Sequence, residues 1–269
     1  MNANTSSQFQ LVNEKGWRRG LGNLLRGEWS SWFKSSRWWK HLLIWFLIIN
    51  GMMGIMIFVS VKEGGGGPPL LVMYGVFGGM CVAIGVMIIM QRVLVREKQQ
   101  GTAAWALSKP VTRTAFVVSR LVVNSIAILL TSVIVPGVIL YIMLGSFSTY
   151  GWLPPFGFSA ALLMYALHAF YWIVLTLMMG TLVESSGAVM AVPITLYFVF
   201  MYGPGMLPPL IYISPLLLNF SPDPDHLNSL ASSFMAGEPV FSWLPLITTV
   251  VACVIFIAVA IWRFNRQEF

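Results

Sequence analysis

The residues best able to do chemistry in this chain are charged side chains gathered between two long apolar runs. Residues 92–120 hold Glu97 and six of the sixteen Lys and Arg residues, namely Arg92, Arg96, Lys98, Lys109, Arg113 and Arg120. The segment also contains Gly101-Thr102 and Lys109-Pro110, and Gly and Pro divide such a stretch into short helices and turns. Its charge and its internal structure predict a surface that docks a soluble partner. The alternative is a solvated connector at the membrane surface.

Motifs for the common nucleotide and hydrolytic chemistries are missing from the sequence. It contains no G-x-x-x-x-G-K-[ST] phosphate loop, no H-E-x-x-H and no G-x-S-x-G. The chain is therefore not expected to be an enzyme or to hold a cofactor of its own. We expect the energy for its work to arrive from a separate protein through residues 92–120.

His168 is the clearest ionisable side chain inside an apolar run, where a proton- or ion-coupled carrier usually keeps one. Tyr165 and Trp172 share its face at helical spacing. The pattern is consistent with a hydrogen-bonded packing histidine, with a substrate-facing residue, or with an enzyme that uses His168. No paired carboxylate or nucleophile motif supports the enzyme. Sixteen Met residues without Cys-x-x-Cys or a His cluster predict no metal site.

The composition is that of a membrane protein. Hydrophobic residues make up 57% of the chain, charged residues 9%, and the mean hydropathy is +0.78. A membrane-spanning helix needs about 20 apolar residues. Six runs meet this length, and they are residues 41–61, 70–91, 120–144, 158–183, 187–207 and 243–262. We predict an all-α membrane protein with six transmembrane helices, in which residues 1–269 form a single domain.

The distribution of Lys and Arg predicts the orientation. Fifteen of the sixteen lie in the first 40 residues, in residues 92–120 or in the tail, and only Lys62 falls on the opposite side. Because basic residues stay on the cytoplasmic side, both termini are expected to be cytoplasmic. The net charge of +7 then reflects this topology and attraction to membrane lipids, and not nucleic-acid binding.

Three further elements surround the spans. Residues 17–40 have Leu and Trp on one face and basic residues on the other, which predicts an amphipathic interfacial helix. Glu28 projects from its apolar face, either sideways to nearby basic residues or water, or toward the segment 92–120 or a docked partner. Residues 64–69 (GGGGPP) predict a turn, and residues 203–242, which include Asp223, Asp225 and seven Pro residues, predict short re-entrant or outer helices.

Small residues and prolines mark particular points along the spans. Gly75, Gly79 and Ala83 form a ridge in the second run that allows close helix packing, a subunit interface or a wall of a transport path. Pro136 and Pro193 are expected to kink the third and fifth runs.

The segment 92–120 resembles a pattern of type-2 ABC transporter permeases. The matching residues are Glu97, Gly101-Thr102, Leu107, Ser108-Lys109-Pro110-Val111, Arg113 and Arg120, which look like the family's E…GT…LLSKPVSR…K pattern just after its second span. Arg26-Gly27-Glu28 resembles its amphipathic elbow helix, and Ile213-Ser214-Pro215 its Pro-rich outer segment. Arg120 replaces a Lys and preserves the charge.

The resemblance implies the membrane subunit of a transporter in the cell membrane, most simply an exporter of an amphipathic or hydrophobic substrate. Two such subunits, identical or paralogous, would pair with two ATP-binding subunits that supply ATP and Mg²⁺. Seven residues would form the coupling site with those subunits, and they are Glu97, Gly101, Thr102, Leu107, Lys109, Pro110 and Arg113. Glu28 would be the elbow contact. The transport path, lined by the second and fifth spans, would include Gly75, Gly79, Tyr165, His168, Pro193 and Tyr197. A membrane anchor that recruits a non-ATPase partner is the alternative.

Overall fold

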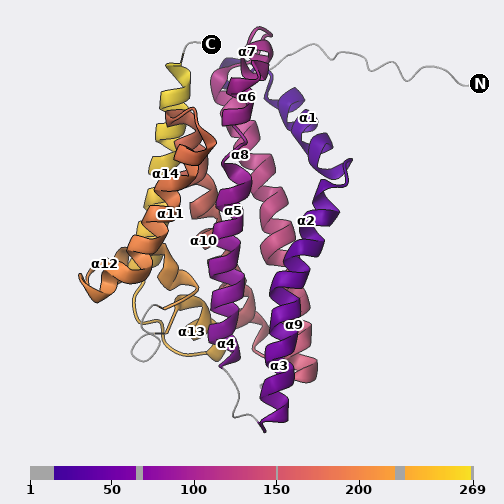
Figure 1. Ribbon diagram of the computed structural model, residues 1–269, viewed down its shortest axis with the longest axis vertical. Coiled ribbons are helices and arrows are strands. Elements are labelled where there is room, and N and C mark those ends of the chain that lie inside the picture. The colour runs from indigo at the N-terminus through magenta and orange to yellow at the C-terminus, as the bar shows by residue number, and fades with distance from the viewer. Residues whose placement is uncertain (1–14, 65–68, 150, 222–227, 268–269) are drawn as a thin grey trace, which may run out of the picture.

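The computed structural model describes residues 15–64, 69–149, 151–221 and 228–267. All regular elements in these ranges are helices, and six helical stretches are long and apolar enough to cross a membrane (Figure 1). These stretches are Arg37–Lys62, Leu70–Gln99, Arg113–Phe147, Pro155–Leu182, Ser186–Gly205 and Leu244–Asn265. The predicted all-α membrane fold with six transmembrane helices is confirmed.

The first three spans are composite, because each contains a π-helical segment. The first joins α2 (Arg37–Trp45), η2 (Phe46–Gly51) and α3 (Met52–Lys62). The second joins α4 (Leu70–Tyr74), η3 (Gly75–Cys81) and α5 (Val82–Met90), and a turn leads on to α6 (Val95–Gln99). The third joins α8 (Arg113–Leu129), η4 (Leu130–Ile134) and α9 (Val135–Phe147). The widened turn η4 ends just before Pro136, whose ring cannot fit a regular helical ladder.

The last three spans are single helices, α10 (Pro155–Leu182), α11 (Ser186–Tyr202) and α14 (Leu244–Asn265). Pro193 lies inside α11 without ending it. The short connection between α10 and α11 is capped by Ser185, whose side chain accepts a hydrogen bond from the backbone of Ala188.

Several helix ends differ from the predicted boundaries. The third span begins at Arg113 and not at residue 120, because the side chain of Thr112 caps it by accepting a bond from the backbone of Ala115. The interfacial helix is shorter than predicted and forms α1 (Leu21–Phe33). It begins after Gly20, whose φ of 81° is left-handed, and a break at residues 34–36 separates it from α2.

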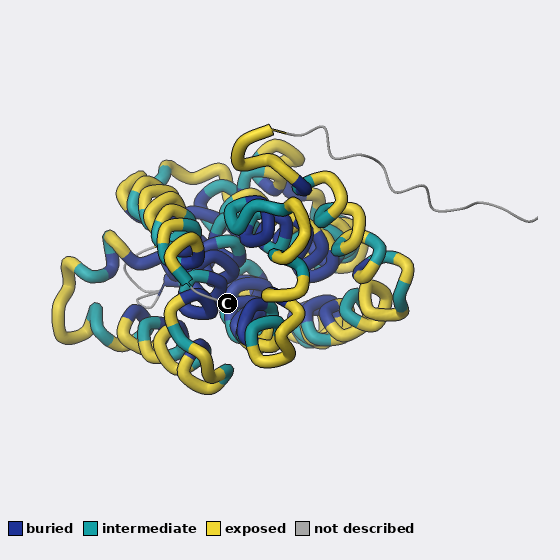
Figure 2. Tube along the Cα trace, turned by 90° about the horizontal axis from the view of Figure 1, so that it is seen from above, coloured by how far each residue is buried: buried dark blue, intermediate teal, exposed yellow. Residues whose placement is uncertain are grey.

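Helix α10 lies at the centre of the bundle and packs against α5, α8, α11, α13 (Leu230–Ala236) and α14. Its Trp172 and Tyr165 are among the largest fully buried side chains. The outer faces of the bundle are exposed (Figure 2), and many of the exposed residues are large and apolar, such as Phe58, Phe147 and Val254. An apolar surface of this extent fits contact with lipid and not with water.

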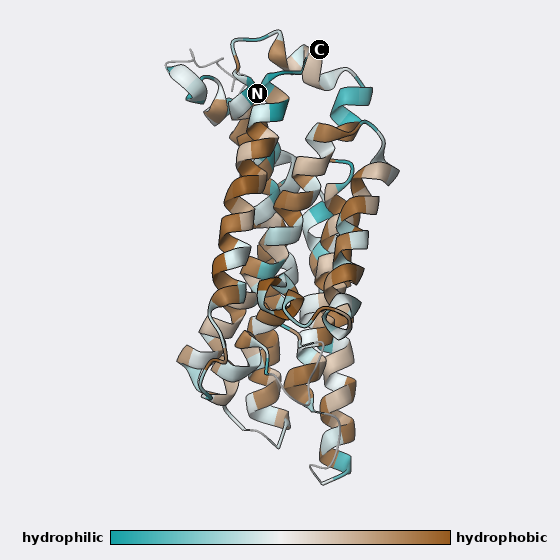
Figure 3. Ribbon diagram, turned by 90° about the vertical axis from the view of Figure 1, so that its left-hand side faces the viewer, coloured by the Kyte–Doolittle hydropathy of each residue, from teal (hydrophilic) through white to brown (hydrophobic). Residues whose placement is uncertain are grey.

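Both termini lie at one end of the bundle, beside α1, α6 and α7 (Thr102–Leu107) (Figure 1). We call this the basic end, and hydrophilic residues gather there (Figure 3). At the far end lie the starts of α4 and α10 and the short helices η6 (Pro215–Leu218) and α13, with α12 (Leu210–Ile213) beside them. The short outer helices match those expected in residues 203–242. Most of the predicted turn 64–69, and Asp223 and Asp225, fall outside the described residues.

Candidate functional site

The part of the basic end that projects farthest in Figure 1 is α7 with the turns on either side of it, residues 101–110, which we call the tip. It begins at Gly101, where a φ of 68° favours glycine. Trp105 is 65% exposed, and the Lys109 ammonium lies 3.6 Å from the centre of its ring. Pro110 is also exposed. An exposed Trp held by a cation–π contact is a side chain suited to insertion into a partner's surface.

The base of the tip is held by the N-terminal segment. The backbone N–H of Thr112 donates to the carbonyl of Arg19 (3.1 Å), and the hydroxyl of Thr112 donates to the carbonyl of Trp17. Gly20 packs directly on Val111, since a Cβ at residue 20 would lie 2.6 Å from the Val111 Cγ2 atom. The chain before α1 and the turn before α8 therefore form one joined structure.

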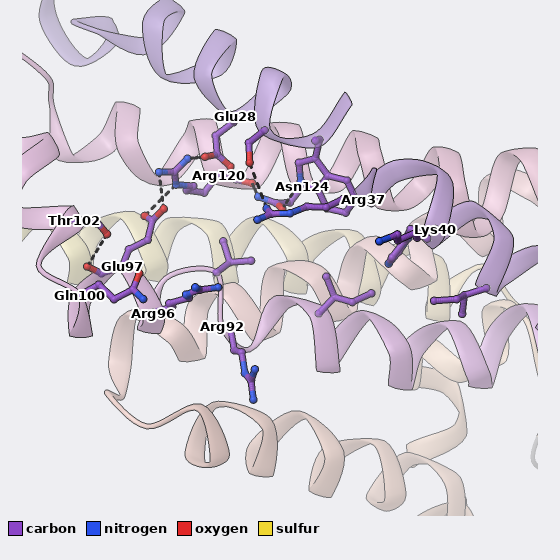
Figure 4. Close-up of a pocket in the computed structure, with 16 residues that line it drawn as sticks. Glu28, Arg37, Lys40, Arg92, Arg96, Glu97, Gln100, Thr102, Arg120 and Asn124 are labelled. Atoms are coloured by element: carbon purple, nitrogen blue, oxygen red, sulfur yellow. Dashed lines mark hydrogen bonds and ion pairs between the residues drawn. The ribbon is translucent and has the colours of Figure 1, made fainter. Parts of the chain in front are cut away.

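Arg120 is the electrostatic centre of the basic end. Its guanidinium forms an ion pair with Glu28 of α1 and a two-point contact with Glu97 of α6 (Figure 4). The distances to Glu97 are 2.6 Å from Nη2 to Oε1 and 3.1 Å from Nε to Oε2. The side chains are only 12% (Arg120), 20% (Glu28) and 22% (Glu97) exposed. Each of these partly buried ions is stabilised by its counterion, because burial of an unpaired charge is costly in free energy. Arg120 thus connects the interfacial helix, the end of the second span and the start of the third.

The interfacial helix runs alongside α8 in a fixed alignment. One turn beyond the Glu28–Arg120 pair, the Trp32 indole N–H donates to the Asn124 side-chain oxygen (2.9 Å). Asn124 in turn donates to the carbonyl of Arg120 (2.7 Å). Farther along, His41 of α2 lies in hydrogen-bond contact with Thr131 of η4 (2.9 Å). The first and third spans are therefore linked side by side from the base of the tip into the membrane.

A second set of contacts holds α6 and the start of α8 to the other side of the basic end. Lys98 donates to the carbonyl of Thr181 (3.2 Å) and Gln99 to that of Glu184 (2.9 Å), at the connection between α10 and α11. Arg113 donates to the carbonyl of Asn265 (2.7 Å), at the end of α14. The two elements that flank the tip, α6 and the start of α8, are thus held to the end of α10, to the α10–α11 connection and to the end of α14.

The structure divides the seven predicted coupling residues into two groups. Gly101, Thr102, Lys109 and Pro110 are exposed at the tip, and the Thr102 hydroxyl donates to the carbonyl of Glu97 (3.1 Å). Glu97, Leu107 and Arg113 lie below them and face the protein: Leu107 packs against the core, and the other two make the contacts described above.

Sequence reasoning overlooked Trp105 and gave Arg120 no role beyond its charge. The available signal for Trp105 was a single Trp in a basic segment, four residues before Lys109. For Glu28, the contact that the structure gives is with Arg120, the last residue of the segment 92–120.

The predicted path residues of the second span lie against the outer segment. A Cβ at Gly75 would lie 2.5 Å from the carbonyl oxygen of Asn219, and one at Gly79 would lie 3.0 Å from the Asn219 Cβ. These glycines allow close approach of η3 to the chain that follows η6. Asn219 is only 2% exposed.

The other predicted path residues are packed in the bundle centre. His168 Nδ1 contacts the carbonyl of Pro215 (2.9 Å), and His168 Nε2 accepts from the Trp172 indole (3.1 Å). A single neutral tautomer, protonated on Nδ1, satisfies both bonds. Tyr165 packs against Tyr74 with 4.4 Å between the ring centres, and Tyr197 packs against Trp172. Pro193 is buried as well. In this conformation these residues form core, and their role in a path stays a prediction. No group of three His, Cys, Asp or Glu side chains placed to hold a metal occurs within the described ranges.

Comparison with known families and proteins places this arrangement in context. Residues 52–269 match the family described as ABC-2 family transporter protein. The match includes α6, the tip and Arg120, and it begins after α1 and Glu28. No curated protein matches the chain.

Proposed function

Since the chain belongs to the ABC-2 transporter permease family and is a membrane subunit of an ABC transporter, we propose that it serves an exporter of an amphipathic or hydrophobic substrate. The cargo class is supported by the aromatic centre of the bundle, where Tyr74, Tyr165, Trp172 and Tyr197 pack together. The middle parts of the spans carry no Asp, Glu, Lys or Arg. A bundle interior that is aromatic and free of these charges suits apolar cargo better than ions.

The tip is the docking site for the ATP-binding subunit in this proposal, and the exposed Trp105–Lys109 pair is the observation that carries it. Membrane subunits of this family are not ATPases themselves, so ATP and Mg²⁺ are held by the partner. Trp105 would enter a cleft on that partner, while Gly101 and Pro110 fix the two turns that present it. Two copies of the chain, or this chain and a paralogue, would pair with two ATP-binding subunits.

The contacts below the tip suggest how movement of the partner reaches the bundle. A displacement of α7 pulls on the Thr112–Arg19 junction and on the Arg120 ion pairs. Hydrogen-bonded pairs link α1 to α8 and α2 to η4. The first and third spans therefore move together when α7 is displaced. ATP-driven closure of the partner would thereby reorient the spans in an alternating-access cycle, or extrude a substrate captured laterally.

The basic end is the cytoplasmic end of the protein in this proposal, with both termini inside the cell and the bundle in the cell membrane. A single Cys tests the orientation in a chain whose Cys81 and Cys253 are replaced by Ala. Ala236→Cys at the far end should react with an impermeant thiol reagent added outside intact cells. Ser108→Cys at the tip should react only after permeabilisation, and the reverse pattern would overturn the orientation.

The partner itself is tested by purifying the tagged chain in mild detergent and measuring the mass of the intact complex. A mass equal to two membrane chains plus two soluble ATPase subunits supports the proposal. Recovery with a soluble partner that does not bind ATP would favour the alternative, a membrane anchor that recruits some other protein.

A further inference from the structure

A cavity at the basic end lies beside the base of the tip, and Thr102 is the residue of the tip that lines it. It is a cleft of about 630 Å³ between α1 and α2 on one side and the end of the second span on the other (Figure 4). Arg37 and Lys40 belong to the first wall, and Arg92 and Arg96 to the facing wall. The Arg120 ion pairs close its inner end. A cavity of this size is large enough for a small ligand or a lipid headgroup.

The charges that line this cleft do not balance. Five Lys and Arg side chains face two carboxylates, and both carboxylates, Glu28 and Glu97, are engaged by Arg120. Arg37 donates to the Ser31 hydroxyl at 3.3 Å. Within the described part of the chain, none of Arg37, Lys40, Arg92 and Arg96 is in an ion pair. Four cations around one cavity create a positive potential that favours an anion.

The position of these cations points to the membrane interface. Arg37 is the first residue of the first span, and Arg92 follows the last residue of α5 by two positions. Trp38 and Trp39, in the same turn as Arg37, are 39% and 47% exposed. Trp beside basic residues at a helix end is typical of the headgroup layer.

Below the cations the cleft becomes apolar. Ile44, two helical turns after Arg37, and Ile89, one turn before Arg92, both line it. Ile44 is 52% exposed, on the face of α2 that a hydrocarbon chain can reach. A free anion needs no apolar wall, whereas an amphiphile with a phosphate head and an acyl tail uses both parts.

We propose that this cleft binds the phosphate headgroup of an anionic membrane lipid, with Arg37, Lys40 and Arg96 around the phosphate and the acyl chains along Ile44 and Ile89. Arg92 lies at the rim, where it can meet a second anionic group. The bound lipid fills the gap between the interfacial helix and the end of the second span and holds these elements around Arg120. It is a resident ligand of the basic end, distinct from both the cargo and the docked ATP-binding subunit.

The experiment measures thermal stabilisation of the purified full-length chain, with its partner if one copurifies, by three additives. These are a diacyl phosphatidylglycerol, a phosphatidylcholine with the same chains, and glycerol phosphate. Stabilisation at low concentration by phosphatidylglycerol alone is the expected result. Equal stabilisation by phosphatidylcholine would overturn the charge argument, and equal stabilisation by glycerol phosphate would overturn the lipid in favour of a free anion.

Variants locate the site. Arg37→Gln with Arg96→Gln should weaken the apparent phosphatidylglycerol affinity at least about tenfold, since charge-assisted hydrogen bonds to a phosphate are lost. The matched control, Arg26→Gln with Lys34→Gln, removes two exposed cations that do not line the cleft and should leave affinity unchanged. If the double variant does not fold, Arg96→Gln alone gives the same comparison with a smaller decrease. Equal affinities in variant and control would overturn the site.

Discussion

The two ends of the bundle are held together by different kinds of contact. At the basic end, charged and polar side chains reach across 92 residues of sequence, as in the pairs Glu28–Arg120 and Trp32–Asn124. At the far end, backbone packs on backbone: Gly75 lies against the carbonyl of Asn219, and Gly157, near the start of α10, lies against the carbonyl of Phe234 in α13. Side-chain contacts near water can shorten, lengthen or exchange partners at modest cost, whereas close backbone packing tolerates little displacement. The difference suggests that movement begins at the basic end and is resisted at the far end.

Removal of the Arg120 charge should have the largest effect on stability. Arg120→Leu leaves Glu28 and Glu97 close together, partly buried and without a counterion, at a cost of up to about 3 kcal/mol. Thermal unfolding in detergent should show a clear decrease in Tm. Arg120→Lys keeps the charge but loses the two-point contact, so its Tm should lie between the Tm of the wild type and that of Arg120→Leu.

A second variant separates loss of charge from loss of packing. Glu28→Gln and Glu97→Gln, combined with Arg120→Leu, should recover much of the lost Tm because no unpaired charge remains. If Arg120→Leu alone unfolds at the wild-type temperature, the ion pairs do not hold the basic end together.

Overpacking of the far end should have the next largest effect. Gly75→Ala places a methyl group 2.5 Å from the carbonyl oxygen of Asn219, and either η3 or the outer segment must shift, at a cost of about 1–3 kcal/mol. Gly51→Ala is the matched control, because nothing lies within 4 Å of a Cβ at that helical position. Equal Tm values for the two variants would show that the contact between η3 and the outer segment accommodates a methyl group without cost, and that close backbone packing does not restrain the far end.

Loss of the buried histidine should have a smaller effect on stability and should leave transport intact. His168→Phe leaves the Trp172 indole N–H and the Pro215 carbonyl without their partner, at a cost of about 1–2 kcal/mol. Transport per folded complex should stay within about twofold of wild type, since this cost changes stability and not a chemical step. Abolished transport in a folded variant would instead assign His168 to the substrate path, and loss of a catalytic activity would assign it to an active site.

Local patterns in the sequence predict the spans and the short helices, but they do not predict which of these elements pack against one another. The apolar runs predict six spans because each satisfies the length of the bilayer by itself, and Gly101 and Pro110 predict the turns of the tip. The ion pairs of Arg120 depend on how α1 lies against α8, and nothing local to residues 28 or 97 encodes that alignment. In the same way, the ridge of Gly75 and Gly79 predicts close packing, while the identity of its neighbour, Asn219, depends on the path of the outer segment.

If the tip transmits the work of an ATP-binding subunit, Trp105 is the side chain whose loss should weaken docking most directly. Trp105→Ala should change the stability of the isolated chain by less than about 0.5 kcal/mol, because the side chain is 65% exposed. Trp152→Ala, at the far end, removes a similarly exposed Trp (61%) and serves as the control. The measurement is the affinity of each purified variant for the ATP-binding subunit in detergent. We expect the affinity to decrease at least about tenfold for Trp105→Ala and to stay unchanged for Trp152→Ala. Wild-type affinity in a folded Trp105→Ala protein would contradict this role of the tip.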